Sequence, residues 1–200
     1  MPNASTSFFG WVAFLLQKYG MLFLRGTGMT LLIALTGTAL GFALGLLVAI
    51  IRTIALPEKK KAGSNAGVIV KRGLLRFVHM LMNVYIQVFR GTPMIVQAVV
   101  IYYGAQYAGV FMDTTFAAVF IISINTGAYM AEIIRGGIVS VDKGQFEAAH
   151  AIGMTHWQTM TTVVLPQAIR NILPSVGNEL IVNIKDSSVL NVISVSELFF

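Results

Sequence analysis

The chain has 200 residues, of which 56% are hydrophobic and only 11% charged, and its mean hydropathy is +0.77. This length suffices for one domain, but the composition excludes a soluble globule and is typical of a polytopic membrane protein. The net charge of +6 is compatible with nucleic acid binding, yet the basic residues lie beside apolar runs, so a positive-inside distribution explains them better. The absence of cysteine excludes disulfides and thiolate metal sites.

Two elements are predicted near the N-terminus. Residues 7–24 are apolar but interrupted by Gln17 and Lys18, and they lack the basic start and cleavage site of a signal peptide. We therefore predict an interfacial helix within an N-terminal segment of residues 1–25. Residues 26–51 contain no charge and exceed the ~20 residues needed to cross the hydrocarbon core, which predicts the first span.

Three glycines recur every four residues in this span, at Gly37, Gly41 and Gly45. They line one face of the helix with bare backbone, which allows another helix to approach closely. The alternative is that glycine is merely tolerated against lipid. We predict close packing.

A basic loop follows, over residues 52–76, with seven Lys or Arg and a single acid, Glu58. By the positive-inside rule this loop is cytoplasmic, which places the N-terminus outside. A solvated orientation signal explains the charge better than an anionic-lipid or nucleic-acid site.

The second span is predicted from two pieces, because residues 94–108 alone are too short to cross. We predict a crossing that begins near Leu74, continues through Arg90 and is kinked at Pro93. An arginine at this depth must pair, face a water-filled path or extend to the interface, and the sequence leaves these alternatives open.

The third span is predicted over residues 114–134, after a short outside turn at 109–113. Asn125, Tyr129 and Glu132 are separated by four and three residues and so share one face of this helix. Polar groups in lipid need partners, so the face turns toward a neighbouring helix or a solute path. For Asn125 we favour helix packing.

A polar insert at residues 142–166 separates this span from the next. Asp142 with Gln145 and Thr155 with Gln158 each have the spacing of a capping box, so each pair predicts the start of a helix.

The first helix of the insert is predicted over residues 143–152. Gly153 would end it in the left-handed conformation, and Pro166 would limit the second helix. So short a helix is marginal in water, so it must pack on a surface. The residues expected to hold the insert against the spans are Phe146, Ala149, Trp157, Met160 and Val164.

The fourth span is predicted from about Leu173, with Pro174 in its first turn. Its second half is interrupted by polar residues, which are tolerated at membrane depth where they line a cavity. The alternative is that Lys185 and Asp186 form an internal ion pair that only fixes packing. The interrupting residues are Asn178, Glu179, Asn183, Lys185, Asp186, Ser187 and Ser188.

Three spaced motifs carry a family resemblance. The insert reads Glu-Ala-Ala, three residues, Gly, nine residues, an aliphatic residue, one residue and Leu-Pro, and two further blocks precede it. Over about residues 20–200 the chain resembles the membrane subunits of ATP-binding-cassette (ABC) importers, in the polar amino acid uptake group. The matching residues are Glu147, Ala148, Ala149, Gly153, Val163, Leu165 and Pro166, then Phe89 to Pro93 with Gln97, then Asn125 to Tyr129 with Ala131 and Glu132.

The resemblance implies an all-α, polytopic membrane helix bundle of the type I importer fold. It comprises the interfacial helix, four spans within residues 26–200 and a cytoplasmic coupling helix in the insert. Family members carry one more spanning helix, and residues 189–200 are too short to supply it, so the domain is expected to be C-terminally incomplete.

The resemblance also implies functional residues. ATPase coupling is expected at Glu147, Ala148, Ala149, Gly153 and Pro166. A path for a zwitterionic amino acid is expected at Arg90, Asn125, Tyr129, Glu179, Asn183, Lys185 and Asp186.

The partners implied are cytoplasmic ABC ATPase subunits, an extracytoplasmic solute-binding protein, a second identical or related permease subunit, a polar amino acid and the lipid bilayer of a prokaryotic cell membrane. The sequence has no P-loop and no catalytic constellation, so it predicts no enzyme, with ATP and Mg bound by the ATPase partner. His79, His150 and His156 lack metal-ligand spacing. The alternative function is a secondary amino acid transporter that works without an ATPase.

Overall fold

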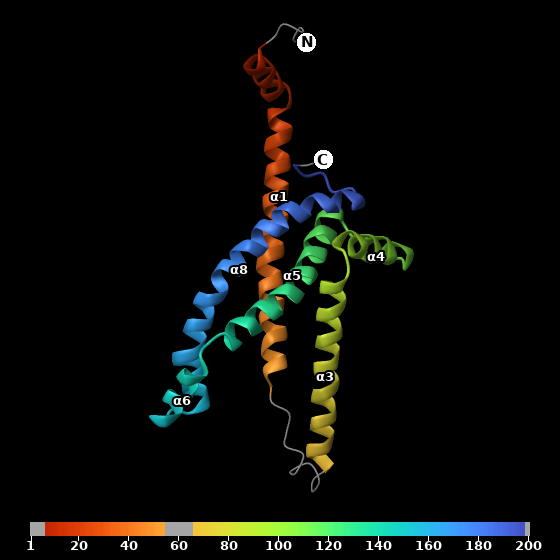
Figure 1. Cartoon of the computed structure of the whole chain (residues 1–200). Coiled ribbons are helices and arrows are strands. Elements are labelled where there is room, and N and C mark those ends of the chain that lie inside the picture. The colour runs from red at the N-terminus through yellow and green to blue at the C-terminus, as the bar shows by residue number, and fades with distance from the viewer. Residues whose placement is uncertain (1–6, 55–65, 199–200) are drawn as a thin grey trace.

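The computed structural model describes residues 7–54 and 66–198, and within them every regular element is a helix. The predicted all-α bundle is therefore confirmed (Figure 1). Residues 55–65 of the predicted basic loop lie outside the described ranges. The elements are α1 (Phe8–Thr53), α3 (Ala66–Gly91), α4 (Met94–Tyr107), α5 (Thr114–Val139), α6 (Lys143–Ala151), α7 (His156–Gln158), the π-helix η1 (Thr159–Val164), α8 (Leu165–Asp186) and the 3₁₀-helix η2 (Ser187–Ile193).

Helix α1 is continuous over 46 residues, so the predicted boundary between an interfacial helix and the first span is absent. Gln17 and Lys18 lower the hydropathy but are good helix formers, and nothing breaks the backbone pattern near residue 25. Lys18 Nζ lies 5.1 Å from the ring centre of Tyr19. At 1.5 Å per residue the helix is ~69 Å long, more than twice the ~30 Å hydrocarbon core, so part of it extends beyond that core.

Close packing of α1 against α5 confirms the role predicted for the three glycines. A Cβ built on Gly37 would lie 2.4 Å from Ile122 Cγ2, and one on Gly41 would lie 2.6 Å from Thr126 Cβ. At Gly45 the Cβ would lie 2.5 Å from the Met130 side chain. The two backbones therefore approach to a distance that only glycine permits.

Replacing Gly41 with leucine is expected to destabilise the chain by about 1–3 kcal/mol or more, because the added side chain must push α5 away from α1. Gly28→Leu is the matched control on the same helix, since a Cβ there meets nothing within 4 Å. Thermal unfolding in detergent should give a lower Tm for Gly41→Leu alone, and equal values for the two variants would contradict this packing.

The second predicted crossing differs from the structure at Pro93. Helix α3 ends at Gly91, and the axis bends by 113° before α4, so α4 does not continue the crossing. Proline removes a backbone donor and disfavours helical geometry in the preceding residue, which ends α3. Gln97 Nε2 then donates to the freed carbonyls of Phe89 and Thr92, both at 2.9 Å, and stabilises the bend.

By length and hydropathy α1 and α5 qualify as membrane spans, and the bent pair α3–α4 is a third candidate. Helix α8, predicted as the fourth span, does not reach the same hydropathy because of its polar residues. It packs along α5 and crosses α1 (Figure 1).

Prolines are placed differently from the prediction in the last long helix. The helical path is unbroken from His156 to Asp186, so Pro166 does not end a helix and Pro174 lies inside α8 rather than in its first turn. The π-helix η1 ends at Val164, two positions before Pro166. Its wider turn relieves the clash between the proline ring and the carbonyl one turn earlier. The predicted polar interruption appears as the change from α8 to the 3₁₀-helix η2 at Ser187.

Candidate functional site

The insert forms a short helix and a turn, as predicted. Asp142 caps α6 by accepting a hydrogen bond from the Gly144 amide at 2.6 Å, although Gln145 does not complete the predicted reciprocal box. Thr155 and Gln158 make the full capping box of α7, with Oε1 of Gln158 accepting from the Thr155 amide at 2.8 Å.

Gly153 occupies the left-handed conformation that the sequence predicted, with φ of +83°. Its amide donates to the His150 carbonyl and the Met154 amide donates to the Ala149 carbonyl, both at 3.0 Å, which closes the end of α6. A Cβ at Gly153 would meet nothing within 4 Å, so glycine is required here by the backbone conformation and not by space.

Apolar contacts hold the insert against the bundle. Phe146 and Met160 pack on the buried cluster of Val141, Val164 and Ala168. Ala149 is also buried, so four of the five predicted packing residues are confirmed.

The prediction for Trp157 was wrong, since its side chain is 75% exposed. It lies at the wall of a cavity beside α1, and no other described residue covers its outer side. Helical spacing alone does not reveal that the neighbouring elements stop short of this position.

Helix α6 lies at the end of α5 opposite Asp113, together with the C-terminal end of α1 and the N-terminal end of α3 (Figure 1). Glu147 and Ala148 are exposed there, and Glu147 forms no ion pair with any described residue. The insert therefore presents a small-residue surface with one free carboxylate, away from the bundle.

An ion network fixes the same end of the bundle. Glu132 on α5 pairs with Arg52 of α1 and, at 3.0 Å, with Arg135. His79 on α3 is linked to the α1 backbone by Nε2 lying 3.1 Å from the Ile51 carbonyl oxygen. Glu132 thus joins α1 to α5, and it does not line the cavity described next.

A polar cavity of about 440 Å³ lies between the α3–α4 bend, α5 and α8. Asn125 and Tyr129 enter it from α5, and Glu179 and Asp186 enter it from α8. A second cavity of about 520 Å³ shares Asp186 and the residues at the bend, so Asp186 stands between the two spaces.

The lining of this cavity contains two carboxylates, Glu179 and Asp186, and no basic residue. Glu179 is only 8% exposed and makes no hydrogen bond or ion pair with the described residues. Asp186 is the other charged residue of the lining, and Arg90 lies on α3 outside it. Arg90 in turn lies over the ring of Tyr129, with Cζ 5.4 Å from the ring centre. The arrangement can bind an ammonium group at the carboxylates and a carboxylate near Arg90.

Three of the predicted path residues do not line this cavity: Arg90, Asn183 and Lys185. Asn183 is 2% exposed and is bonded on both sides, donating to Thr38 Oγ1 at 2.8 Å and accepting from Thr126 Oγ1 at 3.1 Å. Lys185 is exposed, and no ion pair joins it to Asp186. Asn183 therefore connects α8 to α1 and α5.

Asn125 combines the two roles left open for it, because it lines the cavity while donating to Gln97 Oε1 at 3.0 Å. Sequence reasoning did not select Asn178 or Thr92, which also line the cavity. Asn178 is one of the polar residues that interrupt the fourth span, and Thr92 lies in the motif Phe89 to Pro93, so the sequence marked both residues. It did not show that the bend at Pro93 brings Thr92 to the cavity, because that bend is a tertiary feature.

Comparison with known proteins gives one consistent result. Residues 63–199 match the family described as "Binding-protein-dependent transport system inner membrane component". The chain is 40% identical over 179 residues to the glutamine transport system permease protein GlnP of Escherichia coli K12, covering 88% of this chain and 73% of that protein. It is also 40% identical over 162 residues to the L-cystine transport system permease protein TcyB of Bacillus subtilis, covering 81% of this chain and 63% of that protein.

Solved structures agree with the sequence matches. The crystal structure of an amino acid ABC transporter with histidines superposes with a TM-score of 0.80 at 36% identity, over 98% of this chain and 80% of that one. An inward-facing structure of the MetNI methionine ABC transporter gives 0.67 at 22% identity, over 91% of this chain and 79% of that one, which supports the fold.

Proposed function

The chain belongs to the family of inner-membrane components of binding-protein-dependent transport systems, and from this membership we propose that it forms the translocation path for a polar amino acid. It is the permease subunit of an amino acid ABC importer, a function that its relatives support over an ATPase-independent secondary transporter. The glutamine and cystine systems among those relatives indicate the chemical class of the substrate, an amino acid with a polar side chain.

The main observation in favour of coupling to an ATPase subunit is the exposed surface of α6. Glu147 and Ala148 face away from the bundle, and the apolar side of α6 is fixed to α5 and α8 through Phe146 and Val164. A groove on a cytoplasmic ATPase subunit would accept the small side chains, and a basic residue there would pair with Glu147. Motion of α6 would be transmitted to the spans, because apolar contacts hold the insert against them.

The solute path is proposed at the cavity between the α3–α4 bend, α5 and α8. The carboxylates of Glu179 and Asp186 would hold the ammonium group of the amino acid, and Arg90 would attract its carboxylate. Asn125 and Tyr129 supply neutral hydrogen-bonding groups on the opposite wall. Arg90 does not line the cavity itself but lies over the ring of Tyr129, which does. Asn183 and Lys185 are left out of this path because Asn183 is bonded to Thr38 and Thr126 and Lys185 is exposed.

The protein is a membrane protein of the bacterial inner membrane. We place the end that carries α6 in the cytoplasm and the N-terminus outside, because the C-terminal end of α1 and the N-terminal part of α3 lie at the α6 end and carry Arg52, Lys71, Arg72 and Arg76. The proposed partners are ATPase subunits that bind ATP and Mg, a solute-binding protein outside, and a second permease subunit, identical or related. This chain carries no P-loop and is proposed not to be an enzyme itself.

Uptake of a labelled polar amino acid into proteoliposomes tests the proposal. Transport is expected only when the ATPase subunits and internal ATP are both present, because the work comes from nucleotide binding in another subunit. Liposomes that lack the ATPase but carry an ion gradient are the control. Uptake driven by that gradient alone would show a secondary transporter instead.

A further inference from the structure

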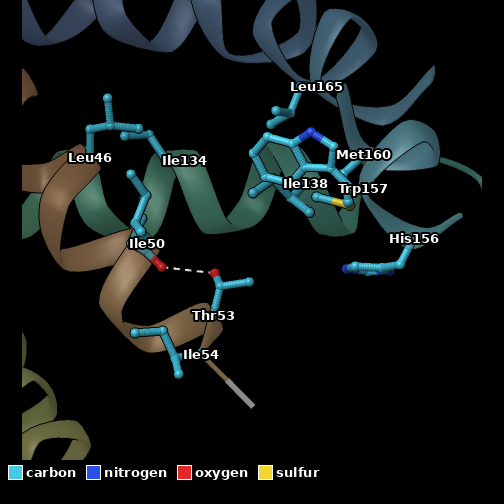
Figure 2. Close-up of a pocket in the computed structure, with 11 residues that line it drawn as sticks. Leu46, Ile50, Thr53, Ile54, Ile134, Ile138, His156, Trp157, Met160 and Leu165 are labelled. Carbon is cyan, nitrogen blue, oxygen red and sulfur yellow. Dashed lines mark hydrogen bonds between the residues drawn. The ribbon is translucent and has the colours of Figure 1, made fainter. Parts of the chain in front are cut away.

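The cavity proposed as the solute path is lined mainly by side chains that form hydrogen bonds. They occupy six of its nine lining positions, whereas the apolar cavity beside Trp157 (Figure 2) has only three such side chains among eleven. A solute in the polar cavity is therefore selected by how its donors and acceptors match those of the lining. The six residues are Thr92, Asn125, Tyr129, Asn178, Glu179 and Asp186.

The backbone at the α3–α4 bend fixes the orientation of the Gln97 side-chain amide. Gln97 Nε2 donates to the carbonyl oxygens of Phe89 and Thr92, both at 2.9 Å, and to Thr92 Oγ1 at 2.8 Å. Carbonyl oxygens only accept, so turning the amide over would place Gln97 Oε1 against two oxygens. Gln97 is 6% exposed, so water does not compensate for that loss. Its Oε1 atom must therefore point away from the bend, toward Asn125.

Gln97 in turn fixes the orientation of Asn125. Asn125 Nδ2 donates to Gln97 Oε1 at 3.0 Å and to the Phe89 carbonyl oxygen at 3.3 Å. These two bonds use both hydrogens of the amide nitrogen. Within the described part of the chain, no donor reaches Asn125 Oδ1. Because Asn125 is 8% exposed and lines the cavity, this oxygen is the group that it offers to a solute.

Most of the other polar groups of the lining also accept rather than donate. The Thr92 hydroxyl gives its hydrogen to a backbone carbonyl of α3 at 2.7 Å, so toward the cavity it only accepts. The carboxylates of Glu179 and Asp186 only accept when they are ionised. Tyr129 and Asn178 can donate as well as accept. The cavity thus offers acceptors at more positions than donors.

We propose that this cavity selects amino acids whose side chain donates hydrogen bonds, with Asn125 Oδ1 as the acceptor and Gln97 as the residue that positions it. The inference rests on the proposed function as an amino acid permease and narrows its substrate class. The amide nitrogen of glutamine or the guanidinium of arginine would satisfy Asn125 Oδ1. Glutamate has the size of glutamine, but its side-chain carboxylate would meet oxygen atoms at Asn125 and Thr92 and lose its hydration without replacement.

Direct binding to the purified full chain with its ATPase subunits tests this selection. The solute-binding protein is left out, so that its own selectivity does not enter the measurement. The probes are labelled glutamine and labelled arginine, each displaced by its unlabelled form or by glutamate. At least one of the two labelled probes is expected to bind, and glutamate should displace it about 30-fold less well or worse, because it leaves buried acceptors unpaired.

The variant Gln97→Met tests the positioning role, because it keeps the length of the side chain and removes the amide. Asn125 can then turn its nitrogen toward the cavity, so the preference over glutamate should fall about tenfold through tighter glutamate binding. A merely structural defect would weaken the binding of all the amino acids instead. Should Gln97→Met not accumulate, Asn125→Ala removes the acceptor itself and should weaken binding of the labelled probe about tenfold, with glutamate unchanged.

Tyr85→Phe is the matched control for general loosening between α3 and α5. It removes the hydrogen bond from the Tyr85 hydroxyl to the Ile124 carbonyl at 2.6 Å, and Tyr85 does not line the cavity. Its preference over glutamate should equal that of the unmodified chain.

Three results would overturn the selection by Asn125 and Gln97 while leaving the permease function in place. They are equal binding of glutamate and of the labelled probes by the unmodified complex, an unchanged preference in Gln97→Met, and an equal loss of preference in Tyr85→Phe. If glutamine, arginine and glutamate all fail to bind, the proposed solute path is itself wrong, and the selection falls with it.

Discussion

Replacing Gly153 with aspartate is expected to abolish association with the ATPase subunit while leaving membrane insertion intact. At φ of +83° an L-residue costs roughly 1–2 kcal/mol, and α6 has only nine residues with which to offset that cost. The new carboxylate also lies at the negative end of the α6 dipole. Both effects disfavour the turn that orients Glu147 and Ala148, which are proposed to meet the ATPase.

Copurification of the ATPase with the membrane-inserted variant measures the effect. Gly153→Asn is the matched control, because asparagine has the shape of aspartate and the same tolerance of the left-handed region but adds no charge. It should retain more of the association, and the difference between the two variants measures the effect of the carboxylate at the end of α6. Since a Cβ at this position meets nothing within 4 Å, steric blocking inside the chain does not explain a loss. Normal ATPase recovery with Gly153→Asp would show that the turn does not position the coupling surface.

Replacing Glu179 with glutamine is expected to lower uptake efficiency by about 30-fold or more. Removing one partner of a desolvated charge pair typically costs about 2–5 kcal/mol, and each 1.4 kcal/mol is a factor of ten. Glu179 is buried, has no partner among the described residues and lines the cavity, so its charge is available to a substrate ammonium group. Glutamine keeps the shape of the side chain and removes only the charge.

Substrate-dependent uptake at several concentrations, with assembled ATPase present, separates binding from assembly. Lys185→Gln is the matched control, since it also removes one charge from α8 but at an exposed position outside the cavity. It should transport as the unmodified chain does. Equal loss in both variants would point to a general effect of charge in α8, and full activity of Glu179→Gln would place the solute path elsewhere.

The predictions of helix caps and turns are confirmed, because these features depend only on residues that are close together in the sequence. The cap at Asp142, the capping box at Thr155 and the left-handed turn at Gly153 each depend on residues within four positions of one another. The glycine stripe of α1 also predicted its close contact, although not that α5 would be the partner.

The predicted helix boundaries differ from the structure where the helix accommodates the residue that was expected to end it. Lys18 interrupts an apolar run, yet a helix accommodates it without a break. Pro166 and Pro174 usually limit helices, but a π-helical turn and the middle of α8 accept them. At Pro93 the reverse occurred, since a predicted kink became a bend of 113°.

The sequence alone determined the membrane class, the family and the helix caps of the insert, because composition, motif spacing and capping are properties of the chain itself. Tertiary structure alone decided which polar residues of the spans meet. Glu179 and Asp186 face a cavity, whereas Asn183 is bonded between α1 and α5 and Glu132 joins two helix ends. In the sequence these residues look alike, because each is a polar residue on an otherwise apolar helix. Their partners lie on other helices, so only the packing of those helices distinguishes a residue that lines a cavity from one that holds two helices together.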